Sequence, residues 1–200
     1  PQNSKGVQSA AYDALARILY GDAEKRNRLS QNGVVDRLLA AGTELFAFDY
    51  EWPLNEDGKV VLWSWSDTDQ TVVENLVTPA SASLYRAEQF ARDAVEISDK
   101  RIEPQVLLMA TLLARDALAA GPNEPVAEGP GTAHNLALVA GPALCADVLA
   151  LSLDTGNYPA ATAVLRVLSQ NGSRHLLDST EDRPSLLAAA LDAPDPSVQF

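Results

Sequence analysis

Apolar side chains recur every three or four positions over most of the chain, which is the spacing of one helix face. Between residues 6 and 20 this face carries alanine, leucine, isoleucine and valine. The stretch 104–120 is apolar nearly all round, so we expect a helix there to lie at the centre of the fold. Further helices are predicted from 34 to about 42, over 81–98 and 132–153, and from 157 to the Asn-Gly pair at 171–172.

Glycine, proline and polar residues mark where these helices begin and end. Gly21 is expected to end the first helix, and Asp22 to cap a short polar helix that runs through Leu29. Gly33 predicts a left-handed stop before the next helix. Three further signals are a loop at 121–131, a helix cap at Thr132 and a kink at Gly141-Pro142.

Residues 44–67 break the helical spacing and contain runs that alternate, as strands do. Asp57-Gly58 separates two such runs, and this dipeptide favours a hairpin turn. A β-hairpin is therefore predicted near 46–66, inserted between helices. Residues 68–79 are expected to form a short helix or loop that Pro79 ends. With a two-residue turn, the facing pairs are Leu54 with Val61, Trp52 with Trp63, and Tyr50 with Trp65.

The aromatic ladder on this hairpin is the candidate functional surface, and its residues are Tyr50, Trp52, Trp63 and Trp65. One interpretation is that the ladder packs against the flank or the N-terminal end of the helices. The other is that the ladder is exposed and contacts a partner, because tryptophan and tyrosine are favoured anchors of protein interfaces. Both interpretations hold if different side chains take the two roles.

The charge of the chain limits its partners. The 200 residues carry a formal net charge of −12. Phosphate contacts need a basic face, so nucleic-acid binding is not expected. An anionic membrane would repel the chain, and the sequence has no apolar run of about 20 residues to span one. A protein or peptide is the expected partner, and the charge favours a basic one.

Residues with catalytic or metal-binding chemistry are few and scattered. His134 and His175 lie far apart in the sequence and lack the spacing of a metal pair, so both are interpreted as surface or helix-end residues. Cys145 lies in an apolar stretch and is interpreted as a small core residue. As the only cysteine it forms no internal disulfide, which favours a cytoplasmic protein. Phosphate-binding, dinucleotide-binding and nucleophile-elbow motifs are missing, so no cofactor, metal or catalytic residue is expected.

Two stretches resemble α-helical repeats. Residues 27–39 (NRLSQNGVVDRLL) resemble the second half of an armadillo repeat, in which an Asn and an apolar residue precede a Gly turn and a Leu-Leu pair follows. Residues 184–198 (PSLLAAALDAPDPSV) closely resemble the middle of a HEAT repeat, in which Asp-Pro-x-Val opens the second helix. Asp195 is expected to cap that helix, Pro196 to set its first turn and Val198 to enter the core.

Weaker repeat signals lie between and within these two stretches. The pair of helices over 81–120 is similar to a tetratricopeptide unit at Ala87, Phe90, Ala94 and Pro104, but the Trp and Gly-Tyr positions of that family are missing. The pentapeptide Leu-Ser-Gln-Asn-Gly occurs at 29–33 and again at 168–172, which is a faint internal repeat.

These resemblances imply an all-α fold: one irregular α-α superhelix over residues 1–200, a HEAT/armadillo-like solenoid of bacterial appearance with the hairpin inserted. The chain begins without Met and stops inside the second helix of the HEAT-like repeat, so we expect a piece of a longer protein. The implied function is a non-enzymatic protein-binding or scaffold module. Two alternatives stay open: a structural or regulatory segment of a larger signalling protein, and a HEAT-like enzyme.

Overall fold

The computed structural model describes residues 4–28, 30–98, 100–121, 124, 126–170, 177–178 and 185–199. Within these residues the chain is mostly helical, with one small antiparallel sheet of two strands. His175, Pro184 and the second Asn-Gly pair at 171–172 lie outside them. The elements are α1 (Ser4–Tyr20), the 3₁₀ helix η1 (Ala23–Arg28), α2 (Gln31–Phe46), β1 (Val60–Ser66), β2 (Thr71–Val77), α3 (Pro79–Ile97), α4 (Glu103–Ala120), α5 (Ala133–Ala140), α6 (Pro142–Asp154), α7 (Tyr158–Gln170), α8 (Leu186–Leu191) and the 3₁₀ helix η3 (Pro196–Val198).

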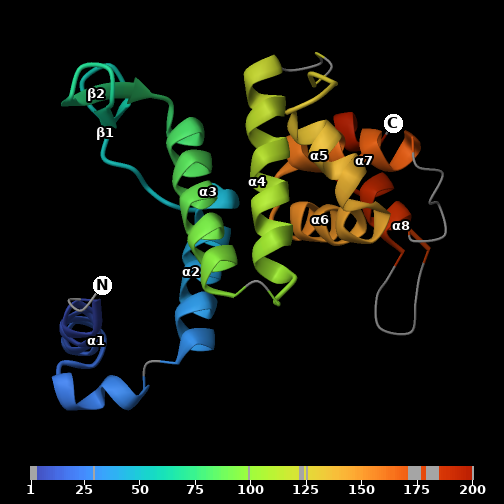
Figure 1. Cartoon of the computed structure of the whole chain (residues 1–200). Coiled ribbons are helices and arrows are strands. Elements are labelled where there is room, and N and C mark those ends of the chain that lie inside the picture. Colours follow the sequence, from blue (N-terminus) through green and yellow to red (C-terminus); the bar gives the residue numbers. More distant parts are fainter. Residues whose placement is uncertain are drawn as a thin grey trace.

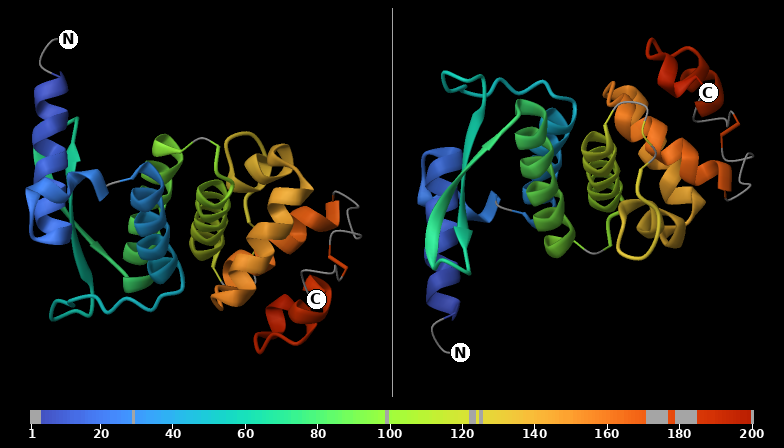
Figure 2. Two further views of the ribbon diagram at one scale, coloured as in Figure 1. Left: turned by 90° about the horizontal axis from the view of Figure 1, so that it is seen from below. Right: turned by 90° about the horizontal axis from the view of Figure 1, so that it is seen from above.

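Helix α4 lies at the centre of the fold, as its apolar sequence predicts. It packs against α2 and α3 on one side and against α5, α6 and α7 on the other (Figure 1). Seen along α2, α3 and α4, the helices α6 and α7 run across them, and α1 and the C-terminal residues lie at opposite ends of the molecule (Figure 2). One hydrophobic core continues from α2 through α4 to α8 and η3.

The helices around α4 approach closely because small residues face one another. Gly42 on α2 is one such residue. A Cβ atom added to it would lie 2.8 Å from Cδ2 of Leu107 on α4 and 3.5 Å from Cβ of Phe90 on α3. Leu107 is buried, as are Ala87 and Ala91 on the facing side of α3. The alanine-rich composition therefore serves tight helix packing, in which a missing side chain lets two backbones approach.

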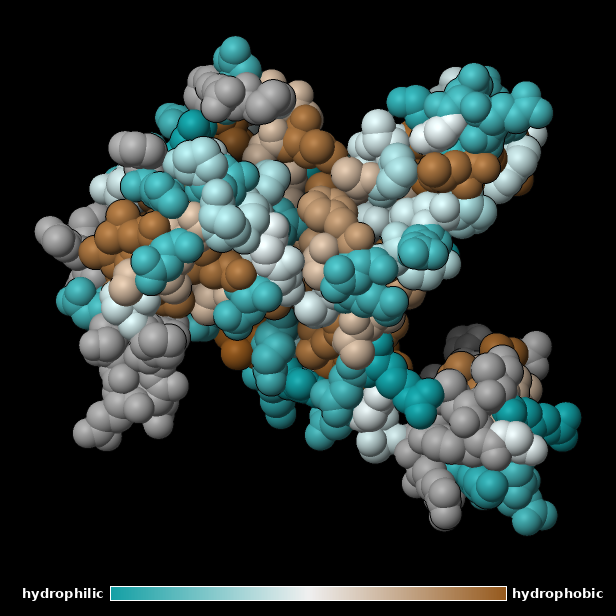
Figure 3. Space-filling model, turned by 180° about the vertical axis from the view of Figure 1, so that it is seen from behind, coloured by the Kyte–Doolittle hydropathy of each residue, from teal (hydrophilic) through white to brown (hydrophobic). Residues whose placement is uncertain are grey.

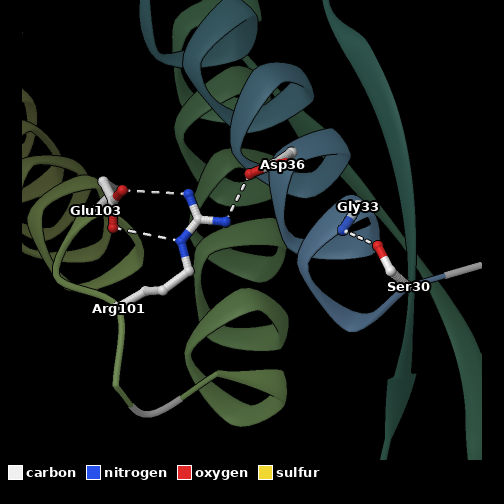
Figure 4. A network of polar contacts seen from close by, with 5 residues as sticks. All are labelled: Ser30, Gly33, Asp36, Arg101 and Glu103. Carbon is white, nitrogen blue, oxygen red and sulfur yellow. Dashed lines mark hydrogen bonds and ion pairs between the residues drawn. The ribbon is translucent and has the colours of Figure 1, made fainter.

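Arg101, just before α4, joins α2 and α4 at one end of the bundle (Figure 4). Its guanidinium lies 2.5 Å from Oδ1 of Asp36 on α2 and 3.2 Å from Oε1 of Glu103 at the start of α4. In addition, Nε2 of Gln31 donates to the carbonyl of Ile97 at the end of α3, at 2.5 Å. These contacts close the end of the bundle where α3 turns into α4.

The roles predicted for two glycines at helix boundaries are wrong, and each has a local cause. Gly33 does not stop a helix: it lies in the first turn of α2, where its N–H donates to Oγ of Ser30 at 2.9 Å (Figure 4). Ser30 is therefore the N-cap residue of α2, and Gly33 belongs to the first turn of that helix. Gly141-Pro142 does not kink a single helix. Gly141 has a φ of +92°, which ends α5, and Pro142 then starts the separate helix α6.

Several predicted boundaries are confirmed. The N–H of Glu24 donates to Oδ1 of Asp22 at 2.9 Å, so Asp22 caps η1. Thr132 caps α5 through the N–H of Asn135. Asp195 accepts from the N–H of Ser197 at 2.9 Å, and Val198 is buried, so the turn predicted after α8 is present. Helices α6 and α7 cross α4 and do not continue a uniform stack of parallel helices (Figure 2).

Candidate functional site

The β-hairpin stands out from the helical part of the molecule (Figure 1). Its strands are rich in valine and tryptophan, which suit a pleated surface. The turn at 67–70 is held by Ser66, whose Oγ donates to Oδ2 of Asp69 at 2.8 Å and accepts from the N–H of Asp69 at 3.2 Å. Gln70 has a φ of +50° and completes the reversal. Side-chain bonds therefore replace the glycine that such turns commonly use.

The predicted pairing of this hairpin is wrong. β1 pairs with β2, so that Trp63 faces Glu74 and Trp65 faces Val72. The segment before β1 is not a strand. Asp57-Gly58 does form a tight turn, in which the N–H of Asn55 donates to the carbonyl of Lys59 at 2.9 Å and the N–H of Gly58 donates to the carbonyl of Asn55 at 3.0 Å, but within the described ranges no strand ladder extends from it. Residues 71–77, expected as helix or loop, supply the partner strand, and Pro79 begins α3 and does not end the preceding segment.

The four predicted contact residues separate into two pairs. Trp52 is half-buried against the core, and its indole N–H donates to Oγ of Ser83 on α3 at 2.8 Å. Tyr50 packs edge-on against Trp52, with ring centroids 4.9 Å apart. Trp63 and Trp65 are 65% and 58% exposed, and Trp63 also lies at the edge of the cleft between the hairpin and the helices α3 and α4. The predicted ladder is therefore divided: Trp52 packs on the helices, whereas Trp63 and Trp65 lie largely exposed on β1.

Trp63 and Trp65 belong to a continuous apolar surface, which we call the outer face of the hairpin. Directly paired residues of an antiparallel ladder project to the same side, and alternate residues share that side. The outer face therefore consists of Val61, Trp63 and Trp65 from β1 and Val72, Glu74 and Leu76 from β2. Val72 and Leu76 are each more than half exposed. Figure 3 shows apolar side chains at the surface of the hairpin, at the upper right, bordered by hydrophilic ones.

Sequence reasoning missed the β2 half of this face. The signal was present, because Thr71, Val72, Val73 and Val77 are β-branched residues in a short run bounded by turn residues. The dipeptide Asp57-Gly58 is a stronger turn signal, and it favoured a pairing of β1 with the segment that precedes it.

Acidic residues are concentrated in the hairpin and in the segment that leads into it. Between residues 49 and 77 the chain has seven carboxylates and one lysine. Glu74 lies on the outer face itself, opposite Trp63. Among the described residues it forms no ion pair. The acidic residues of this segment are Asp49, Glu51, Glu56, Asp57, Asp67, Asp69 and Glu74.

The inner face of the hairpin borders a cleft of about 480 Å³ above α3 and α4. Asn75 and Ser64 lie at this cleft and bond to each other, with Nδ2 donating to Oγ at 2.8 Å. The charged groups of the cleft, Arg115 and Asp116, already have partners within the protein. Arg115 pairs with Glu88 of α3, and Asp116 accepts from the N–H of Ala133 at 3.0 Å. The cleft therefore has few polar groups left for a ligand, and the outer face is the more open surface.

The groups considered for catalysis are held inside the helical part. His134 is buried, with Nε2 3.2 Å from Oε1 of Gln170. The Cys145 thiol is buried, and burial raises its pKa to about 11, which suppresses the thiolate. In the part of the chain that the structure describes, no three His, Cys, Asp or Glu side chains gather in a way that could hold a metal ion. In that same part, no helix is both long and apolar enough to cross a bilayer.

Comparisons of this chain with protein-family models, with curated proteins and with solved structures found no match.

Proposed function

We propose that this chain is a non-enzymatic protein-binding module whose contact surface is the outer face of the hairpin. The observation that carries the proposal is the exposure of Trp63 and Trp65 side by side on one strand, next to the exposed Val72 and Leu76. Large apolar side chains are rarely left together in water on a projecting element, whereas interface cores are rich in tryptophan.

The partner that fits this surface is a basic protein or peptide. An apolar surface that carries the carboxylate of Glu74 and belongs to an acidic segment offers both contact area and electrostatic attraction for a cation. Nucleic acid and anionic membranes fit poorly, because the same carboxylates would repel their phosphates.

The helical part would then be the scaffold that holds the hairpin. Trp52 and the start of α3 fix its base, through the bond to Ser83 and the cap at Thr78. A degenerate HEAT- or armadillo-like repeat remains our proposal for the ancestry of this scaffold. It is supported by the capped turn at Asp195 and by the buried Val198, which have the roles that the HEAT pattern implies.

A displayed library of random peptides, selected on the immobilised protein, tests the proposal. The comparison variant is Trp63→Thr/Trp65→Thr, which removes both indoles while keeping residues suited to strands. Val139→Thr is the matched control, because Val139 is 80% exposed on α5, far from the hairpin in the sequence. We expect enriched peptides that bind the wild type and the control but not the double variant. Failure to enrich any peptide, or equal binding to all three proteins, would refute the proposed surface.

A further inference from the structure

Glu74 gives the outer face a chemical preference that its apolar residues lack. We infer that this face recognises an arginine side chain of the partner, with the guanidinium stacked on the indole of Trp63 and paired with the carboxylate of Glu74. The inference rests on the proposed function, since it names the chemistry that the same surface selects.

The register places the two groups side by side. Trp63 and Glu74 are directly paired across the strands, so their side chains project from the same face. The Cβ atoms of such pairs are about 5 Å apart. A cation is attracted to an indole when it lies within about 6 Å of the ring. A guanidinium over Trp63 is therefore also within reach of the carboxylate of Glu74.

The surroundings of Glu74 make it unusual among the acidic residues of the hairpin. Its neighbours on the outer face are Val72 and Leu76 along its own strand, and Trp63 lies opposite. All three are more than half exposed. In the described part of the chain no lysine or arginine neutralises this carboxylate. It is a single fixed charge inside an exposed apolar surface.

This placement discriminates against an uncharged partner. A neutral apolar segment that covered the face would remove water from the Glu74 carboxylate without forming a new hydrogen bond or ion pair to it. Burying an unpaired charge in this way costs binding free energy. A cation that arrives with the partner restores the lost interaction. The carboxylate therefore acts on selectivity, since it penalises neutral partners and accepts basic ones.

Arginine fits the face better than lysine. A guanidinium is planar and weakly hydrated, so it can stack on an indole while its edge donates to a carboxylate. Trp65 lies next along β1 on the same face and extends the apolar platform beyond Trp63. The aliphatic stem of the arginine can contact that platform.

Binding of two synthetic peptides tests the inference. The first is a blocked nine-residue peptide in which arginine and threonine alternate, and the second carries citrulline in place of arginine, with the same shape and no charge. Affinities are measured by titration for the wild type, Glu74→Gln, Trp63→Thr and Trp65→Thr. Glu96→Gln is the matched control, because it removes one exposed carboxylate at the other end of α3.

We expect the arginine peptide to bind the wild type and to bind Glu74→Gln and Trp63→Thr each about two- to fivefold more weakly. Glu96→Gln should keep most of the affinity. The preference for arginine over citrulline should be smaller in Glu74→Gln than in the wild type, because the two charges act as a pair. Added salt should weaken the arginine peptide more than the citrulline peptide.

Two results would overturn the inference, and they are distinguishable. If Glu74→Gln and Glu96→Gln weaken binding equally while Trp65→Thr still weakens it, the outer face binds peptides but does not recognise arginine at Glu74. If none of the hairpin variants changes the affinity of either peptide, or if neither peptide binds, the inference falls. The peptide-library selection then decides whether the proposed function falls with it.

Discussion

The side-chain amide of Asn157 donates to the backbone carbonyl of Phe46 at 2.8 Å, across 111 residues of sequence. Both residues are fully buried. The same side chain caps α7, because its Oδ1 accepts from the N–H of Ala160 at 3.2 Å. One asparagine therefore satisfies the end of α2 and the start of α7 and joins the two sides of α4.

Replacing Asn157 by alanine should lower the free energy of unfolding by about 2–4 kcal/mol, because it removes a helix cap and leaves a buried carbonyl without a donor. Asn157→Ser keeps an oxygen that can cap α7 but cannot reach Phe46, so its loss should be smaller by about 1 kcal/mol. Urea denaturation followed by circular dichroism measures both. Equal stability of wild type and alanine variant would contradict the role assigned to this residue.

Gly42→Ala should destabilise the fold although alanine favours helices. The new methyl group would lie 2.8 Å from Cδ2 of the buried Leu107. Overpacking of this kind costs about 1–3 kcal/mol, which outweighs the gain of about 1 kcal/mol in helix propensity. Gly6→Ala is the control, because a Cβ at Gly6 meets no atom within 4 Å. If the midpoint of urea denaturation of Gly42→Ala equals or exceeds that of the wild type, α2 and α4 do not approach each other as closely at Gly42 as the structure shows.

The contacts of Arg101 should give a pH-dependent contribution to stability. Its hydrogen bonds hold the pKa of Glu103 below the ordinary value. A lowered carboxyl pKa stabilises the fold above the ordinary pKa of glutamate, about 4.3, and that stabilisation is lost as the pH falls through the lower, folded-state pKa. The difference in stability between wild type and Arg101→Ala should therefore be present at neutral pH and shrink in acid. A difference that does not change with pH would argue against this pair. The effect should be modest, since the Glu103 side chain is 57% exposed.

The Cys145 thiol should be nearly inert in the folded protein. Burial raises its pKa to about 11. At pH 8 the fraction of Cys145 present as thiolate is then about a hundredfold or more below that of an ordinary cysteine. Labelling with a disulfide reagent should be at least that much slower in buffer than in denaturant. Fast labelling of the native protein would show that the core around α6 opens readily.

Tryptophan fluorescence tests the geometry of the candidate site without a ligand. Acrylamide should quench most of the emission of the wild type, because Trp63 and Trp65 are exposed. Trp63→Phe/Trp65→Phe leaves only Trp52, whose ring packs against the core and whose N–H bonds Ser83. Its emission should be blue-shifted and poorly quenched. An unchanged quenching constant would mean that the hairpin folds back onto the helices.

The helical part of the fold could be predicted because its signals are local. The apolar spacing identified the helix over 104–120 and its central position, and Thr132 and Asp195 cap the elements that follow them, as expected. The helix stop predicted at Gly33 is wrong because the sequence alone does not show whether a glycine ends a helix or lies in its first turn. That depended on the Ser30 side chain, which provided the cap.

The hairpin could be predicted only in part because strand pairing is not local. The alternation of Trp63 and Trp65 identified a strand, but its partner could lie before or after it in the sequence. Trp52 also shares the alternation and yet packs on α3, because Ser83 offers an acceptor for its indole N–H. Glu74 gained its significance only from the register, which no single position in the sequence reveals.

Helix α4 has consequences for any attempt to divide this protein. Buried side chains of α4, such as Leu107 and Leu113, belong to a single core that continues on both sides of this helix. Helix α4 therefore cannot be assigned to one side alone. A cut in the loop at 121–131 would separate α5, α6 and α7 from α4, on which all three pack, and would leave α4 with an apolar flank in water. The helices on the two sides of α4 should therefore unfold in one cooperative transition. The hairpin is the part of the chain that could be replaced by another sequence while the helices are kept.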